Sequence, residues 1–342
     1  ETGLALCLMF VVAACSDDAP VRKAMVATAN SHASDAAAAI LAKGGSATDA
    51  AIAAQLVLTL TEPQSSGIGG GLFMLHYAVN DASITTFDGR EKAPLDADET
   101  LFMKPDGKPF AWPDAALGGK PVGTPGVISA LWKAHQKFGR LEWASLFEPA
   151  IRLAEQGFAV SPRLHAAIAD ANHLDTDDAA AAIYFLGDGD YGEPDVAVPV
   201  GHLLKNQPYA DTLKLIAANG SDGFYKGPVA QAIVDAVRSN EVNPGLMTLA
   251  DLSAYEAIER QAVCAPYRAY RVCGMGPPTS GGLTSLMILG LLEPYKLSSL
   301  NPEGLVAAHL LAQASRLAFS DRNQYMACLL YTSDAADDYL TV

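Results

Sequence analysis

A glycine-rich segment at residues 67–71 constrains the fold of this chain more than any other feature. It reads Gly67-Ile68-Gly69-Gly70-Gly71 and follows directly on Glu62-Pro63-Gln64-Ser65-Ser66. Because glycine has no Cβ, these positions allow positive-φ turns and a close approach to another backbone. The apolar run at residues 72–77 then predicts a buried strand. The segment therefore predicts a tight turn that leads into a sheet.

An arginine follows the next predicted strand. Asn80-Asp81 is typical of a turn, and residues 83–87 predict a strand that returns beside the first. Arg90 comes next, in Asp88-Gly89-Arg90-Glu91. The pattern predicts one guanidinium at the mouth of a sheet. On the residues alone, an arginine beside two carboxylates is usually a surface ion pair of little energetic consequence.

Two ligand-binding interpretations of the glycines are disfavoured by their context. A dinucleotide-binding fingerprint has a strand before its glycines and a helix after them, whereas the order predicted here is helix, glycines, strand. A phosphate-binding loop ends in Gly-Lys-Ser or Gly-Lys-Thr, which this segment lacks. A packed turn beneath a helix is the favoured interpretation of the residues alone.

Length and charge limit the functional classes. A chain of 342 residues, 50% of them hydrophobic, can bury a large core as one large domain or two. The formal net charge of -15 argues against nucleic acid as a partner, because phosphates require a basic surface. The charge does not identify a substrate.

The N-terminal residues predict a targeting leader over 1–23. Residues 4–14 are apolar, too short to span a bilayer, and of the length of a signal-peptide core. The following Cys15 lies in Val12-Ala13-Ala14-Cys15-Ser16-Asp17, which resembles a bacterial lipoprotein cleavage box with Cys15 as the lipidated residue. An ordinary secretory signal with a coincidental cysteine is the alternative. We expect a periplasmic or extracellular protein, bound to a membrane only through such a lipid, and a chain that begins inside its leader.

Two of the five cysteines lie close enough in sequence to meet. Cys264 and Cys273 flank residues 266–271 and would face each other in a hairpin. An exported protein allows a disulfide there, but the cross-strand geometry is restrictive. We expect two buried free thiols, with the disulfide as the alternative, and no cysteine that acts as a nucleophile or metal ligand.

The residues predict neither a metal site nor a serine-based triad. The seven histidines are scattered without metal-ligand spacing, and no Gly-x-Ser-x-Gly elbow is present. We therefore assign no metal, no cofactor and no catalytic residue in this chain. The histidines are His32, His76, His135, His165, His173, His202 and His309.

From residue 25 the chain predicts alternating helices and strands. Residues 34–43 predict a helix that ends at Gly44-Gly45, and Ser46 with Asp49 predicts a capping box for the next helix. Residues 175–199 are acidic and lack a pattern, so we expect an irregular loop there. The remaining predicted helices are 47–58, 126–137, 142–156, 209–218, 228–239, 282–292 and 303–325.

A series of motifs resembles the large subunit of the gamma-glutamyltranspeptidases. The series begins with Ala47-Thr48-Asp49-Ala50-Ala51, continues through the glycine-rich segment and reaches Asp88-Gly89-Arg90-Glu91. Each motif is weakly specific, but their order over about residues 24–326 is specific for the family. The further matches are Gly123-Thr124-Pro125-Gly126, Phe224-Tyr225-Lys226-Gly227, Tyr267-Arg268-Ala269-Tyr270, Pro277-Pro278-Thr279-Ser280-Gly281-Gly282 and Asp321-Arg322-Asn323-Gln324-Tyr325.

The resemblance implies an α/β (α+β) fold of the N-terminal nucleophile hydrolase type. This is an αββα sandwich, and residues 24–326 would form its large-subunit half. Such proenzymes cleave themselves, and the new N-terminal threonine of the small subunit attacks a gamma-glutamyl amide such as glutathione. The α-amine of the threonine can act as its base, and backbone donors would stabilise the oxyanion. The implied partners are a gamma-glutamyl substrate and the chain's own small subunit.

The resemblance assigns one substrate-binding residue. Arg90 matches the arginine that binds the α-carboxylate of the gamma-glutamyl group, and a planar guanidinium can hold a carboxylate through two parallel hydrogen bonds. No residue here matches the threonine nucleophile, so we expect the fragment alone to be inactive. The resemblance ends near Tyr325, and we interpret residues 327–342 as an artefactual tail in which Thr332 is not the nucleophile.

Two alternative functions remain open. A related self-processing acylase, acting on a glutaryl group or a poly-gamma-glutamate capsule, would also use a carboxylate-binding arginine. A non-enzymatic, lipid-anchored binding protein would need no small subunit and predicts a natural stop near residue 342. Coding sequence that continues to a threonine at a cleavage point would favour either enzyme.

Overall fold

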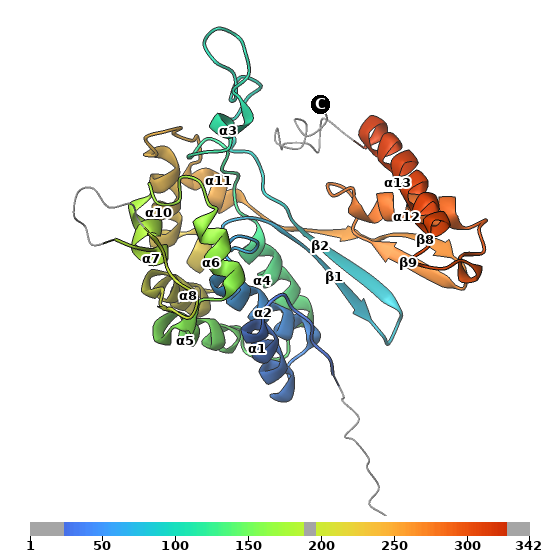
Figure 1. Ribbon diagram of the computed structural model, residues 1–342. Helices are drawn as coiled ribbons and strands as arrows, with labels where there is room; N and C mark the ends of the chain where they lie inside the picture. The colour runs from blue at the N-terminus through green and yellow to red at the C-terminus, as the bar shows by residue number, and fades with distance from the viewer. Residues whose placement is uncertain (1–23, 188–195, 327–342) are drawn as a thin grey trace, which may run out of the picture.

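The computed structural model describes residues 24–187 and 196–326 (Figure 1). The predicted leader with Cys15 and the predicted tail at 327–342 lie outside the described residues. No helix within the described residues combines the length and the apolar character needed to cross a membrane.

A three-stranded antiparallel sheet connects the glycine-rich segment to Arg90. Its strands are β1 (Leu72–Ala78), β2 (Ser83–Gly89) and β7 (Ile258–Gln261), in the order β1-β2-β7. The register pairs Leu72 with Gly89, so the two ends of the β1–β2 hairpin lie together. This confirms the predicted strands and turn, whereas β7 is a strand that the sequence pattern did not indicate.

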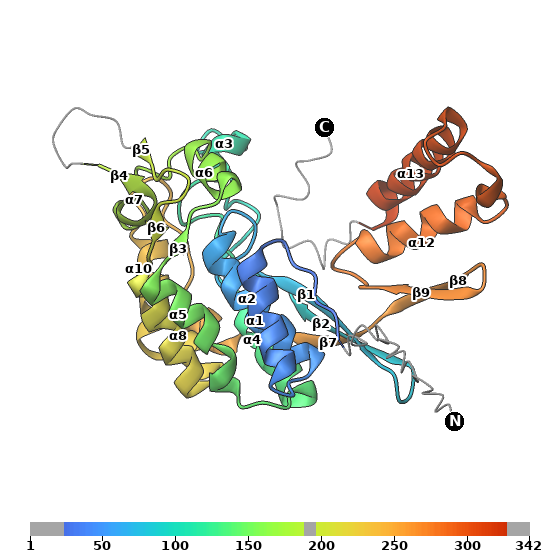
Figure 2. The same cartoon turned by 60° about the horizontal axis from the view of Figure 1, so that its bottom comes forward.

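Strand β1 is only half buried, so the predicted burial of this strand was wrong. Helix α4 (Val127–Phe138) packs on β1 and β2, α2 (Ala47–Thr61) packs on α4, and α1 (Ser31–Ala42) packs on α2 (Figure 2). Successive side chains of a strand point to opposite faces of the sheet, so every second side chain of β1 points away from these helices and stays accessible. Leu75 is 45% exposed and Tyr77 is 57% exposed.

Two buried clusters form the core beneath the helices. The larger one contains small side chains of α1 and α2, whose alanines allow the two helices to approach closely. The smaller cluster gathers around Phe158, Leu164 and Leu204. The remaining helices here are η1 (Trp143–Leu146), α3 (Trp112–Ala115), α5 (Glu148–Gln156), α6 (Pro162–Ala169), α8 (Gln207–Asn219), α9 (Asp222–Tyr225), α10 (Gly227–Arg238) and α11 (Leu249–Ala254).

The predicted irregular loop at 175–199 contains regular structure. Helix α7 (Asp178–Tyr184) begins where the Asp177 side chain accepts a hydrogen bond from the Ala180 N–H, and β4 (Phe185–Leu186) pairs with β5 (Val196–Ala197). The acidic residues thus include a helix N-cap, a role that favours aspartate. A second short strand pair, β3 (Phe158–Ala159) with β6 (Leu203–Leu204), contributes Phe158 and Leu204 to the smaller core cluster, to which β5 contributes Ala197.

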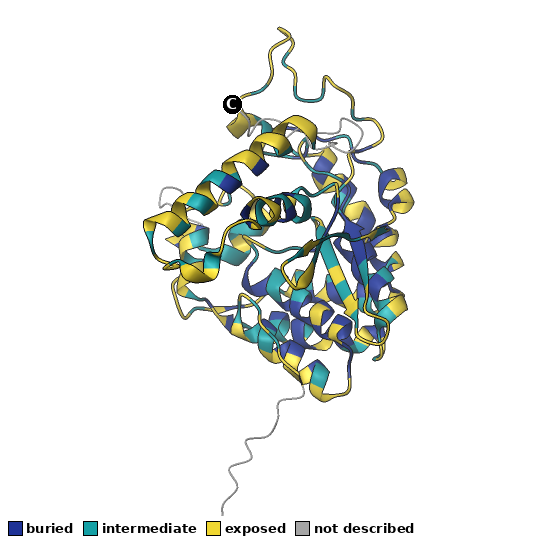
Figure 3. Ribbon diagram, turned by 90° about the vertical axis from the view of Figure 1, so that its right-hand side faces the viewer, coloured by how far each residue is buried: buried dark blue, intermediate teal, exposed yellow. Residues whose placement is uncertain are grey.

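The residues after β7 form a hairpin covered by two helices. Strands β8 (Val263–Tyr267) and β9 (Tyr270–Gly274) pack against α12 (Gly281–Leu292), which packs on α13 (Leu305–Tyr325) after the short η2 (Leu297–Ser299). Neither large buried cluster contains a residue beyond Ala257. Figure 3 shows how much of α13 is exposed. Its large exposed apolar side chains are Leu305, Val306, Leu311, Leu317, Phe319 and Tyr325.

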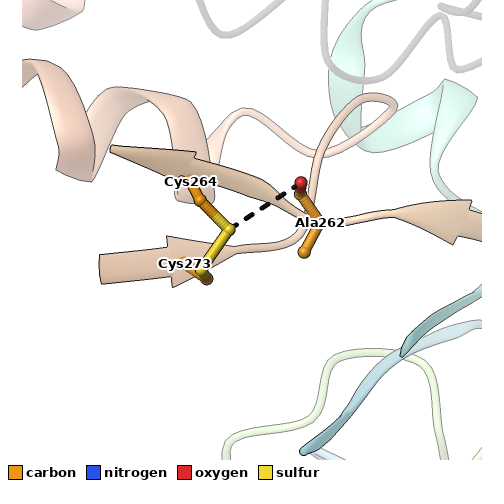
Figure 4. Close-up of a disulfide and its surroundings, with 3 residues drawn as sticks. All are labelled: Ala262, Cys264 and Cys273. Atoms are coloured by element: carbon orange, nitrogen blue, oxygen red, sulfur yellow. Dashed lines mark hydrogen bonds between the residues drawn. A yellow bond between two sulfur atoms is a disulfide. The ribbon is translucent and has the colours of Figure 1, made fainter. Parts of the chain in front are cut away.

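The expectation of two free thiols was wrong, because Cys264 and Cys273 form a disulfide (Figure 4). The predicted hairpin is present, and its register places the two cysteines directly opposite each other. Their Cα atoms are 4.1 Å apart, so the cross-strand geometry that we considered too restrictive brings the sulfurs into bonding range.

Candidate substrate-binding site

The glycine-rich segment is needed for close packing and not for left-handed backbone. None of the glycines at 67–71 has a positive φ, so this part of the prediction was wrong. The predicted close approach is confirmed at Gly71, where a Cβ would lie 2.6 Å from Glu91 Oε2 and 2.8 Å from the Gly89 carbonyl oxygen. Gly70 joins the glycine-rich segment to the start of α4, because its carbonyl accepts hydrogen bonds from the N–H groups of Gly126 and Val127 at 2.9 and 3.2 Å.

A second close contact joins the end of β2 to the start of α4. A Cβ on Gly89 would lie 2.7 Å from Ala130 Cβ, and a Cβ on Gly126 would overlap the Gly89 carbonyl oxygen and the Tyr255 hydroxyl. Glycine at these positions lets the strand end, the helix start and a tyrosine meet at one point. The residue that leaves this point is Arg90.

Arg90 lies directly after β2 and lines a cavity of about 310 Å³. Its Nε is 3.6 Å from Glu91 Oε2, and the Arg90 and Glu91 side chains are 30% and 36% exposed. A contact of this length between partly exposed groups contributes little free energy. The other residues lining the cavity are Asp88, Lys92, Ala93, Tyr255, Glu256, Ile258, Arg260 and Pro278.

Asp88 is paired with another residue of the sheet. Its carboxylate accepts a hydrogen bond from Arg260 Nε at 2.7 Å, and its side chain is 6% exposed. Of the two carboxylates next to Arg90 in sequence, Glu91 thus contacts the guanidinium, whereas Asp88 contacts the Arg90 backbone N–H at 2.9 Å. The surface ion pair expected from the residues alone is therefore present between Arg90 and Glu91.

Lys92, Tyr255 and Arg260 are cavity residues that sequence reasoning missed. Lys92 Nζ lies 5.0 Å from the centre of the Tyr255 ring, and the Tyr255 hydroxyl donates to the Arg90 carbonyl at 2.6 Å. Tyr255 and Arg260 come to the site through the pairing of β7 with β2, which links residues far apart in sequence. A sequence pattern that predicted the pairing of β7 with β2 could have identified Tyr255 and Arg260, but β7 is too short to show such a pattern.

Two of the histidines make contacts of a structural kind. His76 stacks on Phe138 with ring centres 3.7 Å apart, and burial, followed by the charge of Lys137, lowers the pKa of His76. His135 Nε2 lies 2.9 Å from the Leu141 carbonyl oxygen. Among the residues that the structure describes, no three His, Cys, Asp or Glu side chains gather in a group that could hold a metal ion.

The profile of one protein family covers most of this chain. The gamma-glutamyltranspeptidase profile matches residues 33–337. The chain belongs to the gamma-glutamyltranspeptidase family. Its fold class is the predicted one, since the structural relatives include gamma-glutamyltranspeptidases and the chain is of mixed helix and sheet.

Individual members of the family support the same assignment. The "Glutathione hydrolase proenzyme" of Bacillus subtilis (strain 168) is 36% identical over 301 residues, which are 88% of this chain and 50% of that protein. The "Acylase ACY 1 proenzyme" of Pseudomonas sp. (strain SE83) is 37% identical over 307 residues, 88% of this chain and 53% of that protein. The chain thus spans about half the length of these curated relatives.

A solved gamma-glutamyltranspeptidase has a similar structure over almost the same length. The Helicobacter pylori gamma-glutamyltranspeptidase superposes with a TM-score of 0.83 at 30% identity, covering 94% of this chain and 90% of that chain.

Proposed function

We propose that this chain is the large-subunit portion of a glutathione hydrolase that cleaves gamma-glutamyl amides. The observation that carries the proposal is Arg90, a partly exposed guanidinium on the wall of a cavity in a member of this family. An arginine fork suits the α-carboxylate of a gamma-glutamyl donor. The relatives named as glutathione hydrolases support glutathione as the donor.

In the proposed reaction, Arg90 binds and orients the donor. The α-carboxylate would compete with Glu91, whose contact with Arg90 Nε is long at 3.6 Å. We assign the nucleophile to a threonine in the half of the relatives that this chain does not span. That threonine would form an acyl-enzyme with release of the amine, and water or an acceptor amine would then resolve it.

Partners and location complete the proposal. The chain would contact its own small subunit after self-cleavage, in line with the proenzyme names of its relatives. Cys15 would carry a lipid that holds the mature protein at a bacterial membrane, in the periplasm or outside the cell. Labelling of the expressed protein with a radioactive fatty acid tests this, and an unlabelled product that is released into the soluble fraction would contradict it.

A related acylase is the second candidate, because one relative at 37% identity is named as an acylase proenzyme. The two functions differ at the α-amine of the donor, which a gamma-glutamyl group has and a glutaryl group lacks. Both would use the carboxylate site at Arg90.

The deciding experiment uses the full-length gene product. We expect release of glutamate from glutathione, and much slower cleavage of glutaryl p-nitroanilide than of gamma-glutamyl p-nitroanilide. Faster cleavage of the glutaryl anilide would favour the acylase. A stable, unprocessed protein that cleaves neither anilide would contradict both enzymes and favour a binding protein.

A further inference from the structure

Side chains, and not a strand, hold both backbone groups of Arg90. Strand β2 ends at Gly89, so Arg90 lies outside the ladder. Asp88 Oδ1 accepts a hydrogen bond from the Arg90 N–H at 2.9 Å, and the Tyr255 hydroxyl donates to the Arg90 carbonyl at 2.6 Å. These contacts fix the two peptide groups on either side of the Arg90 Cα.

Asp88 is itself held in place. It is 5% exposed, and its second oxygen accepts a hydrogen bond from Arg260 Nε at 2.7 Å. The register pairs Asp88 with Ile258 and Thr86 with Arg260, so Arg260 reaches Asp88 diagonally across two strands. A buried carboxylate with a charged partner on a neighbouring strand has little freedom to move.

Tyr255 is held by a stack of rings. Its ring lies 5.7 Å from that of Tyr225 at an interplanar angle of 4°. The Tyr225 hydroxyl donates to the Pro125 carbonyl at 2.7 Å and accepts from the Ser129 N–H at 3.3 Å, which joins the stack to the start of α4. Burial raises the pKa of Tyr255, and the charges of Asp88 and Glu91 raise it further, so its hydroxyl stays protonated as a donor.

We propose that Tyr255 and Asp88 are positioning residues that set the reach and orientation of the Arg90 guanidinium toward the donor's α-carboxylate. The proposal rests on the proposed function. A two-point contact between two planar groups is sensitive to small displacements. A shift of the Arg90 main chain would therefore weaken binding of the carboxylate and leave the reacting amide untouched.

The test is Tyr255→Phe in the full-length gene product, with Tyr209→Phe as the matched control. Tyr209 is a partly buried tyrosine whose hydroxyl also donates to a backbone carbonyl, that of Leu56 at 3.0 Å, but it does not line the cavity. Two substrates are compared: gamma-glutamyl p-nitroanilide and 4-aminobutyryl p-nitroanilide, which lacks only the α-carboxylate. We expect Tyr255→Phe to raise KM for the glutamyl substrate about fivefold, the loss expected for one hydrogen bond.

The second substrate separates positioning from a general structural effect. For Tyr255→Phe we expect kcat/KM for the aminobutyryl anilide to match that of the parent protein, and for Tyr209→Phe both substrates to behave as in the parent. Equal losses on both substrates, or no loss on either, would overturn the positioning role. A parent protein without turnover of the glutamyl anilide would instead reject the proposed function, and the positioning role with it.

Asp88→Asn provides an independent variant that keeps the shape of the side chain. Its amide oxygen can still accept from the Arg90 N–H, but its NH₂ group cannot accept from Arg260 Nε. We expect the same selective rise in KM for the carboxylate-bearing substrate, and circular dichroism reports whether each variant is folded. A folded Asp88→Asn protein with parental KM would contradict the role of Asp88.

Discussion

In the proposed function Arg90 binds the donor, and the contacts around this residue are well defined. The Arg90 guanidinium is 30% exposed at a cavity wall, while its backbone is bonded at both N–H and C=O. This combination leaves the charged group accessible and fixes the main chain from which it extends. Substitution of the Arg90 side chain should therefore weaken substrate affinity more than it lowers the stability of the fold.

Replacement of the Arg90 guanidinium by a lysine ammonium tests the proposed carboxylate binding directly. We predict that Arg90→Lys in the full-length protein raises KM for gamma-glutamyl p-nitroanilide by about tenfold or more, because lysine cannot make the two parallel hydrogen bonds. Steady-state kinetics measure the effect, with Arg163→Lys at a side chain that is 64% exposed as the control. An unchanged KM for Arg90→Lys would remove Arg90 from the site.

The glycines offer a second test at this scale. Gly126→Ala would place a methyl group against the Gly89 carbonyl and the Tyr255 hydroxyl, whereas Gly69→Ala meets nothing within 4 Å. We predict that Gly126→Ala destabilises the chain by about 1–3 kcal/mol through overpacking and raises KM as Tyr255→Phe does. Urea unfolding and the same kinetic assay check both effects. Gly69→Ala should change neither, and an equal effect of both variants would contradict the packing argument.

At the scale of elements, one aspartate ties a helix start to a loop. Asp49 Oδ2 accepts hydrogen bonds from the Ser46, Arg140 and Leu141 N–H groups at 2.8, 3.0 and 3.2 Å. The predicted capping box of α2 is therefore confirmed. It also holds the turn after α4, which the local sequence did not indicate.

Loss of this aspartate should reduce stability strongly. We predict that Asp49→Ala lowers the free energy of unfolding by roughly 3 kcal/mol, since three N–H groups, that of Ser46 buried and those of Arg140 and Leu141 partly buried, lose their acceptor. Asp35→Ala, at an exposed position of α1, should change it by less than about 0.5 kcal/mol. Urea unfolding of the two variants measures the difference, and similar midpoints would show that Asp49 is dispensable.

The sequence predicted the elements whose signals are local. Apolar spacing, alanine-rich runs and the Ser46–Asp49 cap each act within one or two helical turns, and the helices based on them are present, although the 142–156 helix is divided into η1 and α5. The strands around the glycine-rich segment followed from a similar local pattern. Arg90 at the end of β2 was predictable for the same reason.

What the sequence could not predict depends on pairing between distant strands. Tyr255 bonds to Arg90 across 165 residues, and Arg260 bonds to Asp88 across 172. β7 has four residues, which is too short for a recognisable alternation. The disulfide likewise depended on the register of the β8–β9 hairpin, because a shift of one residue would turn one cysteine to the other face.

For the whole molecule, the residues after β7 are stabilised differently from the rest. They lie outside both large buried clusters, and the Cys264–Cys273 disulfide joins the strands of their hairpin. A cross-link that closes a short loop stabilises by about 2–3 kcal/mol. Helices α1, α2 and α4 are instead stabilised by the larger buried cluster, which does not contain the disulfide.

Reduction should therefore loosen one part of the molecule selectively. We predict that dithiothreitol speeds amide hydrogen exchange in β8 and β9 and leaves α1, α2 and α4 unchanged. Exchange followed by mass spectrometry measures this by peptide. The Cys264→Ser/Cys273→Ser double variant is the control, because reductant should have no further effect on it, and uniform acceleration over the whole chain would contradict the prediction.

The ring stack beneath Arg90 has a consequence for how sequence variation in this protein is interpreted. The Pro125 carbonyl before α4 accepts a hydrogen bond from Tyr225 of α9, whose ring stacks on Tyr255 of the segment after α11. Tyr255 in turn bonds to the Arg90 carbonyl. A genetic screen for weakened donor affinity should then recover substitutions at sites scattered along the gene. Many of them would alter residues that never contact the donor.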